Sequence, residues 1–262
     1  MAIQHRVSVT VRRKRRPARV KSPYISECLG SMGVKATVYV RSQLPSSSGL
    51  GSSAAVTVAT LSAINDEFGR GLTREEVAQR AYEIERTVQK GRASATDTFV
   101  SSFGGVVLIR GPEKRRLPPV NLPLVVGNSR VSHNTSFMVE KVGKEREAHP
   151  GVVNPVLDAI GALTQEALLT LHDLKTLGTL MNTNHALLDA LGVGHPALTR
   201  LVLAARSAGA FGAKITGAGG GGCMVALAPP RARGRVAGAI RGCGAQAIVT
   251  TLDTEGARRE QE

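Results

Sequence analysis

The stretch LPSSSGLGSSAAVTVATLSAIN, residues 44–65, is the feature that most restricts how this chain can fold. Serine and glycine dominate its first ten residues, and a run of small apolar residues follows directly. Such a composition is typical of a flexible linker. It is equally typical of a loop whose bare backbone approaches a ligand and then enters a helix. The loop residues by themselves leave both interpretations open.

The apolar run after the loop favours the second interpretation. Residues 54–64 are long enough for a helix that ends near Asn65, and either Ser52 or Ser53 is the predicted N-cap. A helix start presents unpaired N–H groups and a partial positive charge, so it attracts anions. Glycines before it let the backbone wrap a phosphate. The loop is not a Walker motif, because no lysine follows Gly51.

A second glycine tract, GAGGGG, occupies residues 217–222 between AKIT and CMVAL. Each glycine costs roughly 0.5–1 kcal/mol relative to alanine through lost conformational freedom, so the tract indicates a backbone need. One interpretation is a tight hairpin between two strands. The other is a second backbone wall against a ligand, packed on the first loop. Two glycine loops so far apart in one chain favour a shared site.

Strand and helix patterns alternate without a regular βαβ repeat, which predicts an α+β fold with two packed lobes. HRVSVTV and VKATVYV alternate like strands, and LPLVVGNSRV and AQAIVTTLD also read as strands. The segment after Gly71 is helical, with Thr73 and Glu76 in a capping-box arrangement. GPEKRRLPPVNLP, residues 111–123, reads as an exposed connection. We therefore predict domains at residues 1–122 and 123–262.

The formal net charge of +14 indicates either nucleic acid or an anionic small molecule as the partner. Only 3% of the 262 residues are aromatic, and none is tryptophan, so stacking platforms for nucleic acid are scarce. The basic run from Arg12 to Lys21 is predicted to be a solvated edge or turn, with a basic hairpin near an anionic ligand as one alternative and nucleic-acid binding as a more distant one. The three cysteines are widely scattered, which predicts a reducing cytoplasm. The sequence has no long apolar span, so we expect no membrane partner.

A kinase that acts on a small alcohol needs a phosphate cradle, oxygen ligands for Mg²⁺ and an acceptor for the hydroxyl proton. The first loop supplies the cradle. Ser53 and Glu85 are candidate Mg²⁺ ligands, because this ion prefers hydroxyl, carboxylate and phosphate oxygens. Asp97 stands among small residues that leave room for a substrate, so its carboxylate is the candidate base. The alternative for Asp97 is a surface residue or a helix cap.

These motifs together resemble those of the GHMP kinases. PSSSGLGSSAA is similar to the second motif of that superfamily, and KITGAGGGGC is similar to the third. Within the superfamily, three further stretches resemble the mevalonate kinases: ERTVQKGRASATDTFVSSFGG, GNSRVSHNTSFMVEKV and MNTNHALLDALGVGHPAL. The resemblance covers the chain from Ala2 to about Asp253.

The resemblance implies a GHMP kinase fold, with an N-terminal ribosomal-S5-like domain, a C-terminal ferredoxin-like domain and ATP between them. It implies that Asp97 takes the proton from the 5-hydroxyl of mevalonate, with Mg²⁺ held by Ser53 and Glu85. It places Asn134, Thr135 and Gly219 near the substrate. The residues implied to bind ATP are Pro45, Ser46, Ser47, Ser48, Gly49, Leu50, Gly51, Ser52, Ser53, Ala54, Thr216, Gly217, Ala218, Gly219 and Gly220.

One family motif has no counterpart in this sequence. The superfamily places a P-x-K strand and a G-E-H segment before the part that corresponds to AIQHRVSVTV, and the first domain is therefore expected to be N-terminally incomplete. An abrupt start in a strand fits a start codon set too far downstream. The alternatives left open are another acceptor (phosphomevalonate, homoserine, galactose or shikimate) or a catalytically impaired relative that only binds ligands. A homodimer is also left open.

Overall fold

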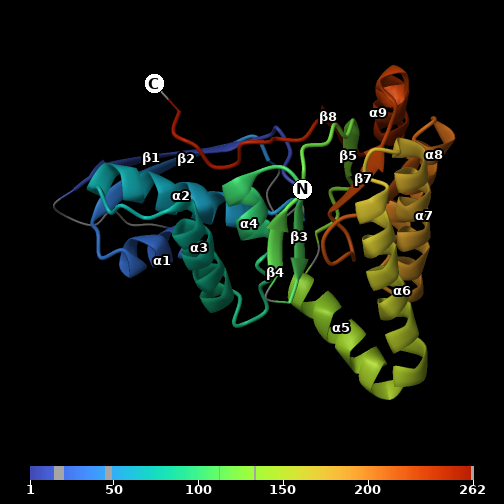
Figure 1. The fold of residues 1–262 in the computed structure, drawn as a ribbon, viewed down its shortest axis with the longest axis horizontal. Coiled ribbons are helices and arrows are strands. Elements are labelled where there is room, and N and C mark those ends of the chain that lie inside the picture. Colours follow the sequence, from blue (N-terminus) through green and yellow to red (C-terminus); the bar gives the residue numbers. More distant parts are fainter. Residues whose placement is uncertain (15–20, 45–48, 112, 133, 261–262) are drawn as a thin grey trace. The chain divides into compact units, whose positions relative to one another are not determined.

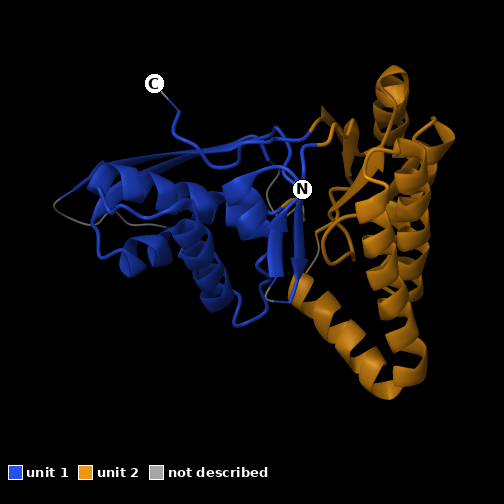
Figure 2. Cartoon of the chain, viewed as in Figure 1, with its two compact units in different colours: residues 1–46, 51–119, 252–262 blue, residues 47–50, 120–251 orange. Residues whose placement is uncertain are grey.

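A computed structural model describes residues 1–14, 21–44, 49–111, 113–132 and 134–260. The chain divides into two compact units (Figure 2). The first comprises residues 1–46, 51–119 and 252–262, and the second comprises residues 47–50 and 120–251. Helices and strands alternate along both units (Figure 1), which confirms the predicted α+β class.

The first unit begins with two antiparallel strands, β1 (Val7–Arg13) and β2 (Ala36–Ser42), in which Val11 lies opposite Val38. Both strands were predicted from their alternating pattern. Helix α1 (Pro23–Ser31) lies between them and was not predicted. It starts with proline in its first turn, where the missing N–H costs no helical hydrogen bond. Of the basic run, residues 15–20 lie outside the described residues.

Three further helices complete the helical part of this unit: α2 (Ser52–Phe68), α3 (Arg74–Val88) and α4 (Thr96–Phe103). The predicted capping box at the start of α3 is confirmed, with Thr73 Oγ1 accepting from the N–H of Glu76 at 3.2 Å. The predicted serine N-cap of α2 is wrong. Gly51 occupies the cap position in the left-handed region, with φ +67°.

The core of the first unit lies between the β1–β2 pair and helices α1, α2 and α3. It contains Val11, Cys28, Ala36, Val58, Leu61, Ile64, Val77, Ala81 and Ile84. Apolar residues three or four apart on α2 and α3 line this core, which is why these segments form helices here. A hairpin of β3 (Val107–Arg110) and β4 (Glu113–Arg116) follows α4.

The second unit is built on a four-stranded antiparallel sheet with the order β6-β7-β5-β8. Its strands are β5 (Leu124–Asn128), β6 (Gly212–Ile215), β7 (Cys223–Leu227) and β8 (Gln246–Thr250). Its helices are α5 (Thr135–Ala148), α6 (Pro150–Leu169), α7 (Leu174–Ala190), α8 (Pro196–Ser207) and α9 (Arg233–Gly242), with a 3₁₀ turn at Pro230–Ala232. Strands β5 and β8 lie in segments that were predicted as strands, and β6 and β7 lie in segments that one of the two interpretations of the glycine tract paired as a hairpin.

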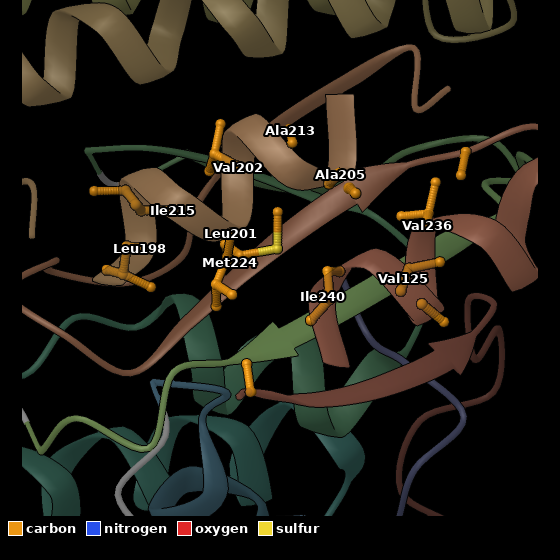
Figure 3. Close-up of a cluster of buried hydrophobic side chains, with 14 of the residues drawn as sticks. Val125, Leu198, Leu201, Val202, Ala205, Ala213, Ile215, Met224, Val236 and Ile240 are labelled. Atoms are coloured by element: carbon orange, nitrogen blue, oxygen red, sulfur yellow. The ribbon is translucent and has the colours of Figure 1, made fainter. Parts of the chain in front are cut away.

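Helices α8 and α9 pack on one face of this sheet (Figure 3). Ala213 and Ile215 of β6, Met224 of β7 and Val125 of β5 meet Leu201 of α8 and Ile240 of α9, all at most 2% exposed. Helix α7 packs against the edge strand β6 through two glycines. A Cβ on Gly212 would lie 2.0 Å from the carbonyl oxygen of Gly178, so only glycine permits this approach.

Residues 252–262 belong to the first unit, whereas they were predicted to lie in the second domain, residues 123–262. The reason is a set of backbone contacts made after β8. Ile3 and Leu252 form an antiparallel bridge, and the N–H of Asp253 donates to the carbonyl of Ala2 at 3.1 Å. Among the described residues, no helix is both long enough and apolar enough to cross a bilayer.

Candidate active site

The described end of the Ser/Gly loop makes one contact in each unit. Pro45, Ser46, Ser47 and Ser48 lie outside the described residues. In the second unit, a Cβ on Gly217 would lie 3.5 Å from the carbonyl oxygen of Gly49. In the first unit, a Cβ on Gly51 would lie 3.1 Å from Cγ of Asp97. The loop therefore approaches the second glycine tract at one residue and the candidate base two residues later.

Asp97 lies in the first turn of α4, a helix that was not predicted. Unpaired N–H groups at a helix start favour a carboxylate there. The Asp97 side chain is exposed to solvent, yet neighbouring parts of the chain displace some of the water around it. This desolvation raises the pKa of the carboxyl. The amino group of Met1 lowers the same pKa to a smaller extent. A carboxylate that a solute reaches, and whose proton affinity is raised, is suited to accept a hydroxyl proton.

Ser53 and Glu85, the two candidate metal ligands, are in direct contact. Ser53 Oγ donates to Glu85 Oε2 at 3.0 Å, and Thr57 Oγ1 lies 3.0 Å from Glu85 Oε1. Ser53 is in the first turn of α2 because Gly51 caps that helix, and Glu85 is in the last turn of α3. Two helices that are sequential in the chain thus bring a hydroxyl and a carboxylate together.

Three residues around Glu85 were missed by the sequence analysis. Gln89 Nε2 donates to Glu85 Oε2 at 2.6 Å, and Thr57 is fully buried beneath the carboxylate. The side chain of Tyr24, on α1, lies beside Glu85 and interacts with Ser53 and Gln89. The sequence spacing could have indicated two of them, because residues four apart on a helix lie on the same face. Thr57 is four residues after Ser53, and Gln89 is four residues after Glu85.

Glu85 is only 4% exposed, and its burial raises the pKa of its carboxyl, opposed by hydrogen bonds from Thr57, Ser53 and Gln89. The donor set fits Mg²⁺, which accepts one carboxylate and one hydroxyl and takes its other ligands from phosphate and water. The described residues contain no cluster of three His, Cys, Asp or Glu side chains that would bind a metal ion through protein groups alone.

The second glycine tract connects β6 to β7, so it is the hairpin that one interpretation predicted. Its path is held from two sides. Gly220 N donates to the carbonyl of Val193 at 2.8 Å, and Gly222 N donates to the carbonyl of Val131 at 2.9 Å. At its start, Thr216 Oγ1 donates to the carbonyl of Cys223 at 3.0 Å. The hairpin is therefore fixed, and it presents a backbone surface with few side chains.

Asn134 and Thr135 lie at the start of α5, in the same unit as the glycine tract. Asn134 caps the helix, its Oδ1 accepting from the N–H of Phe137 at 3.1 Å, and Thr135 is exposed. One turn further, Met138 packs on the tract, and a Cβ on Gly220 would lie 2.7 Å from its sulfur. A substrate role for Asn134 and Thr135 stays a prediction.

Comparison with known proteins defines the class. The domain family described as GHMP kinases N terminal domain matches residues 18–105, and GHMP kinases C terminal matches residues 162–246. The chain belongs to the GHMP kinases, a family of phosphotransferases, and it has their fold.

Within this family, the chain is similar to mevalonate kinases. It is 48% identical to the mevalonate kinase of Thermococcus sibiricus over 231 residues, which is 86% of this chain and 69% of that relative. It is 44% identical to that of Pyrococcus furiosus over 238 residues, 88% of this chain and 70% of the relative. The crystal structure of the L. major enzyme in complex with R-mevalonate superimposes with a TM-score of 0.82 at 25% identity, covering 97% of this chain and 89% of that one.

Proposed function

We propose that this chain transfers the γ-phosphoryl group of ATP to the 5-hydroxyl of mevalonate, giving 5-phosphomevalonate and ADP. The contact between Gly51 and Asp97 carries the proposal, because it sets the only carboxylate of α4 against the loop that has the composition of a phosphate cradle. Relatives at 44–48% identity that are named mevalonate kinase support the choice of acceptor.

Asp97 accepts the proton of the substrate hydroxyl as the hydroxyl oxygen bonds to phosphorus and the bond from phosphorus to the ADP oxygen breaks. Its place in the first turn of α4 fixes the carboxylate, and its solvent-exposed side chain reaches an incoming alcohol. Positioning and charge stabilisation provide most of the catalysis in phosphoryl transfer. Gly51 contributes by bringing the backbone close to this carboxylate without a side chain.

Ser53 and Glu85 are the residues that would hold Mg²⁺, which neutralises charge on the phosphate oxygens when bound. Thr57 and Gln89 hold the two oxygens of Glu85 in fixed directions. The N-terminus of α2 adds partial positive charge beside the loop. The glycine tract of Thr216–Gly220 is proposed to present backbone groups to ATP, and Asn134, Thr135 and Gly219 to contact mevalonate.

The deciding experiment measures ADP release with R-mevalonate and, in parallel, with phosphomevalonate, homoserine, galactose and shikimate at equal concentrations. We expect the highest kcat/KM for mevalonate. A higher value for another acceptor would reassign the substrate within the family. Stoichiometric ATP binding without turnover of any acceptor would support the ligand-binding alternative and overturn the proposal.

We further propose that the reaction takes place in the cytoplasm and involves no nucleic acid. Cys28 and Cys243 form no disulfide among the described residues, which supports a reducing compartment. A homodimer stays a prediction of the resemblance, and sedimentation equilibrium of the purified protein tests it.

A further inference from the structure

Residues 252–257 cross the C-terminal end of α4, the helix that begins with Asp97. The N–H of Gly105, just after α4, donates to the carbonyl of Asp253 at 2.6 Å, and the N–H of Ala257 donates to the carbonyl of Ser102 at 3.1 Å. We call residues 252–257 the clasp. It satisfies one of the carbonyls that the last turn of a helix leaves unpaired.

Two glycines make this crossing possible. Gly104 and Gly256 both have positive φ, +69° and +71°. A Cβ on Gly104 would lie 2.4 Å from the nitrogen of Gly256, and a Cβ on Gly256 would lie 2.4 Å from the carbonyl oxygen of Ser102. The two backbones therefore touch with no side chain between them, and only glycine at both positions permits this approach.

The buried side chain of Asp253 stabilises the turn of the clasp. Its side chain is 7% exposed and pairs with the guanidinium groups of Arg6 and Arg258. Its Oδ1 accepts from the backbone N–H groups of Glu255 at 2.9 Å and Gly256 at 2.8 Å, closing the turn that brings Gly256 onto α4. A buried carboxylate is stable only with such partners.

Two arginines from other elements hold the clasp from outside. Arg74, at the start of α3, donates from Nη1 to the carbonyl of Glu255 at 3.1 Å and from Nη2 to the carbonyl of Ala257 at 3.2 Å. Arg116 of β4 donates to the carbonyl of Thr254. Side chains from α3 and β4 thus converge on a segment with no regular structure of its own.

A helix of eight residues has little stability of its own, so α4 depends on what holds it. In its middle, Phe99 stacks on Phe103 of the same helix, and Lys114 of β4 restrains it with Nζ 4.1 Å from the centre of the Phe99 ring. Its last turn is held by the clasp. Asp97 is at the other end of the same two turns, so its direction depends on both restraints.

We propose that the clasp, fastened by Asp253, positions the Asp97 carboxylate for proton abstraction by holding the C-terminal end of α4. Asp253 is then a positioning residue, distant from the reacting atoms. The catalytic part of this inference rests on the proposed function, and the structural part is independent of it.

The test compares Asp253→Asn with Glu260→Gln. Glu260 is a carboxylate of the same chain segment, but it lies outside the clasp and accepts a hydrogen bond from Ser8 Oγ at 3.1 Å. Hydrogen exchange of the α4 amides, measured without substrate, should rise at least tenfold in Asp253→Asn and stay unchanged in Glu260→Gln. In the mevalonate assay, kcat per nucleotide-binding site should fall about tenfold in Asp253→Asn, with KM for ATP unchanged.

Asp253→Asn removes a buried charge and risks misfolding, so a milder variant is needed. Arg74→Met removes two hydrogen bonds to the clasp from an exposed side chain. It also removes a cation from a helix N-terminus, where the helix dipole disfavours it, so α3 itself is not weakened. Arg70→Met is the matched control, because Arg70 bonds the carbonyl of Met32 away from the clasp. We expect faster α4 exchange and a threefold lower kcat in Arg74→Met alone.

Unchanged α4 exchange in both Asp253→Asn and Arg74→Met would overturn the inference, whatever the substrate. Faster exchange with unchanged kcat would reject the catalytic link. A wild-type chain that binds ATP but turns over no acceptor would instead reject the proposed function, while the exchange result would still decide whether the clasp holds α4.

Discussion

Gly51 and Asp97 pack so closely that a methyl group on Gly51 would crowd the Asp97 carboxylate. A Cβ on Gly51 would lie 3.1 Å from Cγ and 3.3 Å from Oδ2 of Asp97. The residue that caps α2 and the carboxylate at the start of α4 are therefore in van der Waals contact across 46 positions of sequence. Because both belong to one unit, this contact is part of its packing.

Gly51→Ala is expected to lower kcat at least tenfold, since the new methyl group displaces the Asp97 carboxylate. Gly71→Ala is the control, because Gly71 has a similar φ of +70° and no atom of the described residues lies within 4 Å of the place that its new methyl group would take. Both variants should lose about 1–2 kcal/mol of folding free energy from left-handed strain alone. Turnover and urea unfolding measure the two effects, and equal kcat values for both variants would contradict the contact's importance.

Asp97→Asn should leave nucleotide binding within twofold of wild type and lower kcat by roughly 10²–10⁴, because the amide keeps the shape but accepts no proton. Calorimetry with ATP and the ADP-release assay give the two values. Asp66→Asn, at an exposed carboxylate of α2, is the control and should stay fully active. An Asp97→Asn enzyme with near-normal turnover would remove Asp97 from the proposed role.

The pH profile of the wild-type enzyme should have an acid limb above the ordinary aspartate value of about 3.9. Desolvation raises the pKa of Asp97 against the smaller opposite effect of the Met1 amino group, and the base works only when ionised. Turnover is therefore lost as the pH falls through the raised pKa. Burial also raises the pKa of Glu85, so titration of Glu85 would give an acid limb as well. The pH dependence of the residual activity of Asp97→Asn must therefore be measured too. The same limb in that variant would assign the titration to another group.

The raised pKa of Asp97 affects the stability of the fold in the opposite direction from its effect on activity. A carboxyl whose pKa is raised on folding stabilises the folded state fully below its unfolded value, and this contribution is lost as the pH rises through the folded value. Because Asp97 is exposed, the contribution is small. Activity and stability therefore respond to pH in opposite directions at this residue.

Ser53→Ala should weaken ATP binding five- to tenfold in the presence of Mg²⁺ and leave metal-free ATP binding unchanged. The hydroxyl that contacts Glu85 Oε2 is lost, and with it one oxygen of the proposed metal site. Ser62→Ala, on the same helix α2, is the control for the loss of a hydroxyl. Calorimetric titrations with and without Mg²⁺ make the comparison. Equal losses in the two titrations would show that Ser53 contacts the nucleotide and not the metal.

The sequence was sufficient for the parts of the site that local pattern encodes. The Ser/Gly loop before α2, the Thr73 capping box and the hairpin around residues 217–222 all follow from turn and helix chemistry within a few residues. The N-cap of α2 was predicted wrongly because serine and glycine both suit that position, and only the left-handed φ of Gly51 decides between them.

Contacts between distant segments had no such local pattern. Tyr24 reaches the Glu85 carboxylate from α1, a helix whose nine residues gave no clear periodicity. The clasp lies some 150 residues after α4, and its bonds are mostly to backbone groups, which every sequence provides. The helix that carries Asp97 was not predicted, because the segment around it mixes small residues with strand formers.

Gly219→Ala is expected to cost about 1–3 kcal/mol more folding free energy than Gly244→Ala. Both glycines have φ +79°, so left-handed strain is the same. At Gly244, no atom in the described part of the chain lies within 4 Å of the added Cβ, whereas at Gly219 the added Cβ would lie 2.1 Å from the carbonyl oxygen of Val193. This carbonyl also accepts from Gly220 N, so moving it breaks a hydrogen bond of the tract. Urea unfolding followed by circular dichroism gives the difference. Equal losses would show that the loop at Val193 yields freely, in which case the tract is not the rigid wall that ATP binding is proposed to use.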